Sequence, residues 1–195
     1  MTTERILDRK LAVPALVGDP AGLLIVAGLA GAAKDIAALT DESPNVFLMG
    51  GAMGAAVPFA LGLAYAQPTR RVLAVTGDGD LMMSIGILST IGVMQPPNLA
   101  ILCVDNGHYG ETGYQAGHTS RGVDLEKIAQ GSGIATTHTV STEVDFEAAA
   151  KSLRNSNGPA FVWLRVTTER PPAYKRNFDA VERKAIFRRA LLGQG

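Results

Sequence analysis

The chain has 195 residues, of which 47% are hydrophobic, and its 18 basic and 18 acidic residues give a formal net charge of zero. This length and composition are typical of one folded domain with a substantial core. The balanced charge argues against a nucleic-acid partner, and the apolar runs are too short and too interrupted to span a membrane. Cys103 is the only cysteine, which excludes a disulfide framework and an iron–sulfur cluster. We expect a cytoplasmic enzyme or enzyme subunit with a single domain over residues 1–195.

Helical periodicity and continuous apolar runs alternate along the chain. In order, the sequence predicts helix 3–17, strand 23–26, helix 32–39, strand 46–49, helix 55–66, strand 71–76, helix 81–94, strand 99–104, helix 124–130, strand 135–140, helix 142–153 and strand 159–166. Apolar strands without alternation are typical of parallel strands that are covered on both faces. The pattern predicts an α/β fold, a doubly wound, mostly parallel six-stranded sheet with helices on both faces.

Three segments depart from simple alternation. The helix over 81–94 is apolar nearly all round, so we expect it to be buried. The stretch 106–122 is rich in Gly, Thr, His and Tyr, and a loop of this length in a compact domain is usually functional or disordered. The tail or helix over about 170–195 is basic, and we expect it to face solvent or a protein partner.

Glycine-rich or polar segments follow three of the predicted strands. They are Gly50–Gly54, Gly77–Asp80 and Asn106–Gly122, and ligands of doubly wound sheets bind at the edge where the strands end. Alone, Gly77–Asp80 is typical of a strand-to-helix turn with a capping Asp. It is not a dinucleotide fingerprint, because no third glycine stands at position 82, and the chain has no P-loop.

Asn106 changes the interpretation of Asp78, because it directly follows the next strand. A carboxylate, an amide oxygen and a main-chain carbonyl are hard oxygen ligands that suit Mg²⁺, which takes its other ligands from phosphate and water. A helix beginning at Leu81 would offer free N–H groups and its positive dipole end to the same phosphates. The alternatives are that Asn106 only opens a turn and that Met53 is an ordinary core residue.

Gly-Asp-Gly followed by an Asn after a strand, with Gly51–Gly54 upstream, resembles the motifs of thiamine diphosphate (ThDP) enzymes. The resemblance implies that Met53 wedges between the two cofactor rings and that the Gly51 carbonyl contacts the aminopyrimidine. It implies that Asp78, the Asn106 side chain and the His108 carbonyl bind Mg²⁺. The further cofactor contacts that it implies are Ala52, Gly77, Gly79, Asp80, Leu81 and Tyr109.

A narrower resemblance runs over about residues 47–134. Leu81–Met83, Leu88–Gly92, Tyr109–Gln115 and His118–Thr119 are similar to the ThDP-binding half of sulfopyruvate and phosphonopyruvate decarboxylases. The resemblance implies the ThDP-binding beta subunit of a ThDP- and Mg²⁺-dependent decarboxylase of a small anionic 2-oxo acid. Conversion of 3-sulfopyruvate to sulfoacetaldehyde and CO₂ is the favoured reaction. The alternatives are a subunit of a ThDP-dependent oxidoreductase or carboligase, and a non-catalytic cofactor-binding scaffold subunit.

Two residues depart from the family pattern. Asp80 stands where a small residue is usual, and its carboxylate would repel a diphosphate. We therefore expect Asp80 to point away as a helix cap or to contact the metal through water. Tyr114 follows Gly113 where relatives commonly carry Gly or Asn, which leaves the substrate open because this loop would face it.

The chain has no room for the pyrimidine-binding domain whose Glu activates the cofactor in this family. We therefore expect a separate alpha subunit with that domain, an α₂β₂ or larger hetero-oligomer, and no turnover by this chain alone. In the 106–122 loop, Glu111 and His118 are the catalytic candidates, since Glu111 could transfer a proton. His118, Arg121 and Gln115 are candidates for binding the anionic substrate, or these side chains contact the partner.

Overall fold

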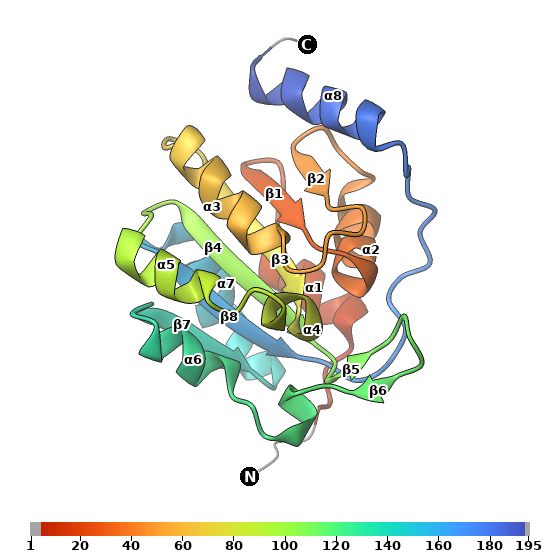
Figure 1. Ribbon diagram of the computed structural model, residues 1–195, viewed down its shortest axis with the longest axis vertical. Helices are drawn as coiled ribbons and strands as arrows, with labels where there is room; N and C mark the ends of the chain where they lie inside the picture. The colour runs from red at the N-terminus through yellow and green to blue at the C-terminus, as the bar shows by residue number, and fades with distance from the viewer. Residues whose placement is uncertain (1–4, 194–195) are drawn as a thin grey trace.

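The computed structural model of the chain describes residues 5–193. Its centre is a six-stranded sheet in the order β2-β1-β3-β4-β8-β7, in which every pairing is parallel (Figure 1). The strands are β1 (Leu23–Ala27), β2 (Val46–Leu48), β3 (Arg71–Gly77), β4 (Leu99–Asp105), β7 (Thr136–Val140) and β8 (Ala160–Arg165). The predicted fold class is confirmed, and each predicted strand is present to within two residues at either end.

Helices cover both faces of this sheet. They are α1 (Arg9–Val17), α2 (Ala30–Thr40), α3 (Ala56–Ala66), α4 (Asp78–Met82), α5 (Ile87–Met94), α6 (Leu125–Gly131), α7 (Phe146–Asn155) and α8 (Ala180–Leu191). One core cluster joins the sheet to α1, α2 and α7, and a second joins its other face to α3, α5 and α6. Neighbouring strand residues such as Leu24 and Ile25 enter opposite clusters, because side chains alternate along a strand.

The first helix is shorter than predicted. It begins at Arg9, because the Asp8 carboxylate accepts a hydrogen bond from the Lys10 N–H at 2.8 Å and caps the helix. Leu7 instead forms a parallel bridge with Val166, next to β8. Pro14 lies inside α1 rather than at its end. Residues 3 and 4, where the predicted helix began, lie outside the described residues.

The single helix predicted over 81–94 is wrong. The segment forms α4 and α5, which are separated by a turn at residues 83–86. The turn is pinned to the preceding loop, since the Ser84 hydroxyl donates to the Gly54 carbonyl at 2.6 Å. The prediction that this segment is buried also fails in the isolated chain, because Met83 is 65% exposed and Val93 is 85% exposed.

The predicted loop over 106–122 contains a small antiparallel hairpin, β5 (His108–Tyr109) and β6 (Gln115–Ala116), and a 3-10 turn, Thr119–Arg121. The basic C-terminal segment runs from β8 past this hairpin and α2 before it forms α8 (Figure 1). The Tyr174 hydroxyl donates to Asp41 at 2.7 Å on the way. In the part of the chain that is described, no helix is long and apolar enough to cross a membrane.

Candidate functional site

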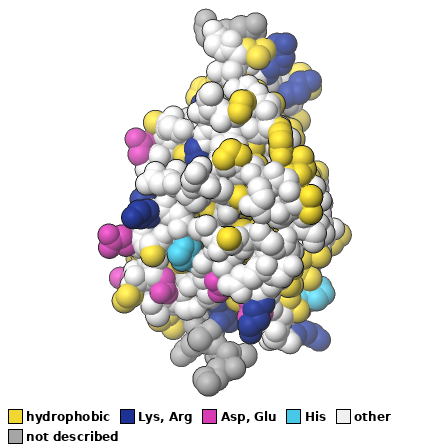
Figure 2. All heavy atoms as spheres, turned by 90° about the vertical axis from the view of Figure 1, so that its left-hand side faces the viewer, with side chains coloured by type: hydrophobic (Ala, Val, Ile, Leu, Met, Phe, Trp, Pro, Cys, Tyr) yellow, Lys and Arg dark blue, Asp and Glu magenta, His cyan; other side chains and the backbone are white. Residues whose placement is uncertain are grey.

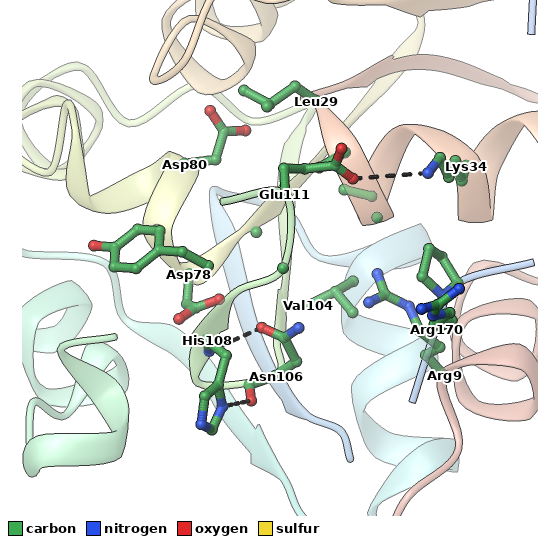
Figure 3. Close-up of a pocket in the computed structure, with 18 of the residues that line it drawn as sticks. Arg9, Leu29, Lys34, Asp78, Asp80, Val104, Asn106, His108, Glu111 and Arg170 are labelled. Atoms are coloured by element: carbon green, nitrogen blue, oxygen red, sulfur yellow. Dashed lines mark hydrogen bonds and ion pairs between the residues drawn. The ribbon is translucent and has the colours of Figure 1, made fainter. Parts of the chain in front are cut away.

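A cavity of about 850 Å³ lies where the strands of the sheet end (Figure 3). Its walls come from the β1–α2 loop, the β3–α4 turn, the hairpin and the C-terminal segment. The residues with ionisable side chains that line it are Arg9, Lys34, Asp78, Asp80, His108, Tyr109, Glu111, Tyr114, Glu169, Arg170, Tyr174 and Lys175. The β3–α4 turn and the residues after β4 meet here because β3 and β4 are neighbours in the sheet.

Asp78 is the first residue of α4 and is 5% exposed. Burial raises the pKa of Asp78 to about 7, and the negative charge of nearby Asp105 contributes to the rise. Its only side-chain donor within residues 5–193 is the Thr119 hydroxyl at 3.4 Å, and that hydroxyl lies closer to Asp105, at 2.8 Å. The backbone N–H groups of Asp78 and Gly79 and the charge of Arg5 act on this pKa in the opposite direction but do not offset the burial. A buried carboxylate of this kind is suited to receive a cation.

Asn106 directly follows β4, and its side chain is directed toward the Asp78 carboxylate (Figure 3). The Asn106 Oδ1 atom accepts the His108 N–H at 3.0 Å, and the His108 Nδ1 atom lies 3.0 Å from the Asn106 carbonyl oxygen. These contacts form a compact turn that holds both residues beside Asp78. The structure therefore brings together the three residues that were predicted to bind Mg²⁺.

The set of donors fits a metal that also binds phosphate. The described residues contain no cluster of three or more His, Cys, Asp or Glu side chains that could hold a metal ion by themselves. Asp78, Asn106 and a main-chain carbonyl are a smaller set, and Mg²⁺ commonly completes such a set with phosphate oxygens and water.

Asp105 organises this region and was not predicted as a site residue from the sequence. The side chain is fully buried in β4 and accepts four hydrogen bonds: from Arg5 at 2.9 Å, Trp163 at 2.8 Å, the Thr119 hydroxyl at 2.8 Å and the Gly107 N–H at 2.6 Å. It thereby ties the start of the 106–122 loop to β8 and the N-terminal segment. The available signal was a carboxylate at the end of an otherwise apolar strand, next to Asn106.

Asp80 points away from Asp78, as expected, but its side chain does not cap α4. Its Oδ1 atom accepts the Gly54 N–H at 2.6 Å, and its Oδ2 atom accepts the Thr76 hydroxyl at 2.8 Å. The carboxylate points away from Asp78 and connects the β3–α4 turn to the loop that carries Met53 (Figure 3). Gly28 leaves room for it, because a Cβ atom there would overlap the Asp80 carboxylate.

The predicted cofactor contacts divide into two groups. Met53 is 42% exposed and lines the cavity, as do Gly77, Gly79 and Tyr109. The Tyr109 ring packs directly on Gly79, where a Cβ atom would overlap it. Gly51 and Ala52 are exposed but do not line the cavity, and the side chain of Leu81 is buried in the core, so that only its backbone could serve a ligand.

Of the catalytic and substrate-binding candidates, one lines the cavity and three lie outside it. Glu111 lines the cavity, and its carboxylate lies 3.7 Å from the Lys34 ammonium group. Gln115, His118 and Arg121 do not line it. Gln115 lies in β6, and His118 and Arg121 lie in the following segment, at the 3-10 turn. His118 instead lies with its Nδ1 atom 3.3 Å from the Tyr109 hydroxyl. Their roles stay predictions. The cavity walls formed by Arg9, Lys34 and residues 169–175 were not predicted from the sequence, although the C-terminal tail was recognised as basic.

The chain matches known proteins over most of its length. The family model described as thiamine pyrophosphate enzyme, C-terminal TPP binding domain, matches residues 30–164. Sulfopyruvate decarboxylase subunit beta of Methanocaldococcus jannaschii is 38% identical over 132 residues, which are 68% of this chain and 69% of the relative. The same subunit of Methanothermobacter thermautotrophicus is 32% identical over 161 residues, 83% of each chain. Phosphonopyruvate decarboxylase of Streptomyces viridochromogenes is 36% identical over 126 residues, but these are only 31% of that longer protein.

Solved structures agree with this assignment. A putative thiamin diphosphate-dependent enzyme from Mycobacterium smegmatis has a TM-score of 0.65 at 25% identity, over 81% of this chain and 31% of that one. The 4-hydroxybenzoylformate decarboxylase of Rhodococcus jostii, at 22% identity and a TM-score of 0.69 over 85% of this chain and 34% of that one, supports the fold. The chain therefore belongs to the thiamine pyrophosphate enzymes and carries their C-terminal TPP-binding domain.

Proposed function

We propose that the chain is the ThDP-binding subunit of a ThDP- and Mg²⁺-dependent decarboxylase that acts on a small anionic 2-oxo acid. Among such acids we favour 3-sulfopyruvate, which would yield sulfoacetaldehyde and CO₂. The observation that carries the proposal is the buried Asp78 carboxylate, directed toward Asn106 at the wall of a cavity large enough for a cofactor. The similarity to beta subunits of sulfopyruvate decarboxylase over most of both chains supports the choice of reaction.

The residues of this chain would divide the work as follows. Asp78, the Asn106 side chain and the His108 carbonyl would hold Mg²⁺ and, through it, the diphosphate. Met53 would support the bent cofactor, and the Tyr109 ring on Gly79 would close the wall beside it. When bound, ThDP supplies the electron sink that allows a 2-oxo acid to lose CO₂.

Glu111 is the residue proposed to transfer a proton near the reacting carbon. It lies on the cavity wall between β5 and β6. The ammonium group of Lys34 lies 3.7 Å from its carboxylate, and a carboxyl group at this wall has the chemistry of a general acid or base. Because both side chains are partly exposed, their interaction is weak.

A second subunit would complete the active site. We propose an alpha subunit with a pyrimidine-binding domain and an activating Glu, in an α₂β₂ or larger hetero-oligomer. The relatives named as beta subunits support a hetero-oligomer. Figure 2 shows hydrophobic side chains on the face that includes α3 and α5, and a contiguous apolar surface commonly marks a protein interface. Its exposed large apolar side chains include Phe59, Tyr65, Met83, Val93 and Met94.

The reaction can be tested by mixing the subunits. We expect the purified chain with ThDP, Mg²⁺ and 3-sulfopyruvate to release no CO₂. The same chain co-purified with its pyrimidine-domain partner should release CO₂ and free sulfoacetaldehyde in equal amounts. Robust decarboxylation by the 195-residue chain alone would contradict the divided site.

The second candidate function is a carboligase subunit. It is favoured by similarity to the large subunit of acetolactate synthase isozyme 1 of Escherichia coli, which is 31% identical over 128 residues, 61% of this chain and 23% of that protein. The products separate the two functions, because a carboligase forms a new carbon–carbon bond in place of a free aldehyde. Product identification in the reconstituted complex therefore decides between them.

A further inference from the structure

The cavity has a basic end that lies away from the proposed metal site. Arg9 on α1 and Arg170 on the C-terminal segment line this end, and Val104 separates them from Asp78 and Asn106 (Figure 3). Lys34 and Lys175 line the same cavity. The metal and the diphosphate would occupy the acidic end, so the basic end is free for another anion.

Arg9 is built into this end of the cavity. The residue is 4% exposed, and the Asp35 carboxylate holds it, accepting from Nε at 3.0 and 3.2 Å and from Nη2 at 2.6 Å. The Nη1 atom donates no hydrogen bond to any side chain or carbonyl within residues 5–193. The guanidinium group is therefore held rigidly and keeps one N–H pair that can donate to a ligand oxygen in the cavity.

The guanidinium group lies against the first turn of α2. A Cβ atom at Gly31 would lie 2.8 Å from Nη1 of Arg9, so only glycine allows this approach. No side chain caps the N-terminus of α2, and Ala30, Gly31 and Ala32 line the cavity. The free N–H groups and the dipole of this 11-residue helix therefore act on the same space as Arg9 Nη1.

Arg170 approaches from the C-terminal segment. Its guanidinium group forms no ion pair or hydrogen bond with another described residue, although it lines the cavity. The segment that carries it is held in place, since Tyr174 donates to Asp41 and the Asn177 N–H donates to Glu42. Pro171 and Pro172 follow directly and restrict the backbone beside Arg170.

We propose that Arg9 and Arg170 form an oxyanion subsite that binds the sulfonate or phosphonate group of the 2-oxo acid substrate. The inference rests on the proposed function and names the side chains that select its substrate class. Guanidinium groups bind tetrahedral oxyanions through paired N–H donors, and the N-terminus of α2 adds backbone donors. A substrate without a second anionic group would leave these donors without partners and would be selected against.

The probes for this subsite are unreactive. 3-Sulfopropanoate has the sulfonate and the carboxylate of 3-sulfopyruvate but lacks the keto group, and butanoate lacks the sulfonate. Binding of each to the full chain with ThDP and Mg²⁺ is measured by calorimetry or ligand-observed NMR. We expect 3-sulfopropanoate to bind at least about ten-fold more tightly than butanoate, because charge-assisted hydrogen bonds are among the strong ones.

Three variants separate the roles. Arg170→Gln should weaken 3-sulfopropanoate binding about ten-fold, and Arg170→Lys should restore part of the loss because it keeps the charge. Gly31→Ala should weaken binding while preserving every charge, since the added Cβ displaces the Arg9 guanidinium group. The matched control is Arg189→Gln, an exposed residue of α8 that does not line the cavity, and it should leave binding unchanged.

The outcomes distinguish the subsite from the proposed function. Unchanged 3-sulfopropanoate binding in Arg170→Gln, or no binding to the wild-type chain at millimolar probe, overturns the subsite. A loss of ThDP affinity in Arg170→Gln with unchanged probe binding also overturns it, and would assign the guanidinium group to the cofactor phosphates. A chain that binds the probe through Arg170 but does not bind ThDP with Mg²⁺ contradicts the proposed function and leaves the oxyanion subsite standing.

Discussion

The β3–α4 turn carries two buried carboxylates, Asp78 and Asp80, whose surroundings differ. Asp78 and Asp80 stand two positions apart, and each is 5% exposed. Asp80 accepts two short hydrogen bonds from other segments, Gly54 and Thr76. Asp78 has one long side-chain contact, from Thr119, besides local backbone N–H groups, and it faces the negative Asp105. Equal burial therefore produces a structural connection on one side and a candidate cation site on the other. What distinguishes them is whether other segments of the protein supply short hydrogen bonds to the buried carboxylate.

The largest expected effect is on cofactor binding by Asp78→Asn. We expect Mg²⁺-dependent ThDP binding to fall at least about 100-fold, because even partners of metal ligands cost 10- to 100-fold when they are mutated. Calorimetry in Mg²⁺ and in EDTA measures this, with Glu147→Gln, an exposed residue of α7, as the control. Equal ThDP affinity of the wild-type chain in Mg²⁺ and EDTA would remove the metal role from Asp78 and Asn106.

For folding stability we expect the opposite order, with the larger loss in the Asp80 variant. Asp80→Ala should lower the free energy of unfolding by about 2–3 kcal/mol, because the Gly54 N–H and the Thr76 hydroxyl would lose their buried acceptor. Asp78→Asn should leave the metal-free chain at least as stable as the wild type at pH 8, since it removes a buried charge beside Asp105. Urea unfolding of both variants gives the comparison. A larger loss in Asp78→Asn than in Asp80→Ala would contradict the distinction between the two carboxylates.

The pH dependence of stability should follow Asp78. Its pKa in the folded chain is about 7, above its ordinary value of 3.8, so the folded state binds the proton more tightly than the unfolded state. The contribution of Asp78 to stability is therefore complete below about pH 4 and is lost as the pH rises through 7, at a cost of a few kcal/mol. Unfolding of the metal-free chain between pH 5 and pH 8 should show this loss. Asp78→Asn should have a flatter profile, and an equally steep one would contradict the assignment.

The smallest effects are expected from two glycines, one on each side of the turn. Gly28→Ala should destabilise the chain by about 1–3 kcal/mol, because the added Cβ overlaps the Asp80 carboxylate. In Gly117→Ala the Cβ would lie 3.1 Å from the Asp78 carboxylate, a milder approach. This change should cost less than about 1 kcal/mol of stability but should weaken Mg²⁺-dependent ThDP binding. Unfolding and calorimetry on both variants complete the comparison, and loss of ThDP binding in Gly28→Ala at unchanged stability would contradict it.

Local sequence information was sufficient for the strands and for most of the helices. Continuous apolar runs such as Leu99–Asp105 are specified by their own residues, because a strand covered on both faces needs an apolar side chain at nearly every position. The break at residues 83–86 was missed because its cause is distant, a hydrogen bond from Ser84 to the Gly54 carbonyl. The exposure of Val93 was missed because an apolar helix has the same composition whether it is covered by its own chain or by a partner.

The candidate site, like the fold, was predicted in part from the sequence. The positions of Asp78, Asn106 and His108 follow from the order of the strands, since residues after neighbouring parallel strands meet at one edge. The basic end of the cavity could not be predicted in this way. Arg9 and Arg170 lie near opposite ends of the chain, and only the packing of α1 on α2 and the path of the C-terminal segment bring them to one cavity.

The Gly77–Asp80 turn shows what the local sequence determines and what depends on the tertiary structure. By itself the sequence determined the alternation of strands and helices, the glycine turn and the resemblance to ThDP enzymes, because these depend on residues close together in the chain. Only the tertiary structure decided that Asp80 accepts short hydrogen bonds from Gly54 and Thr76 while Asp78 has only a long side-chain contact. The physical reason is that the energy of a buried carboxylate depends on the donors and charges around it, and these come from segments that the sequence places far apart.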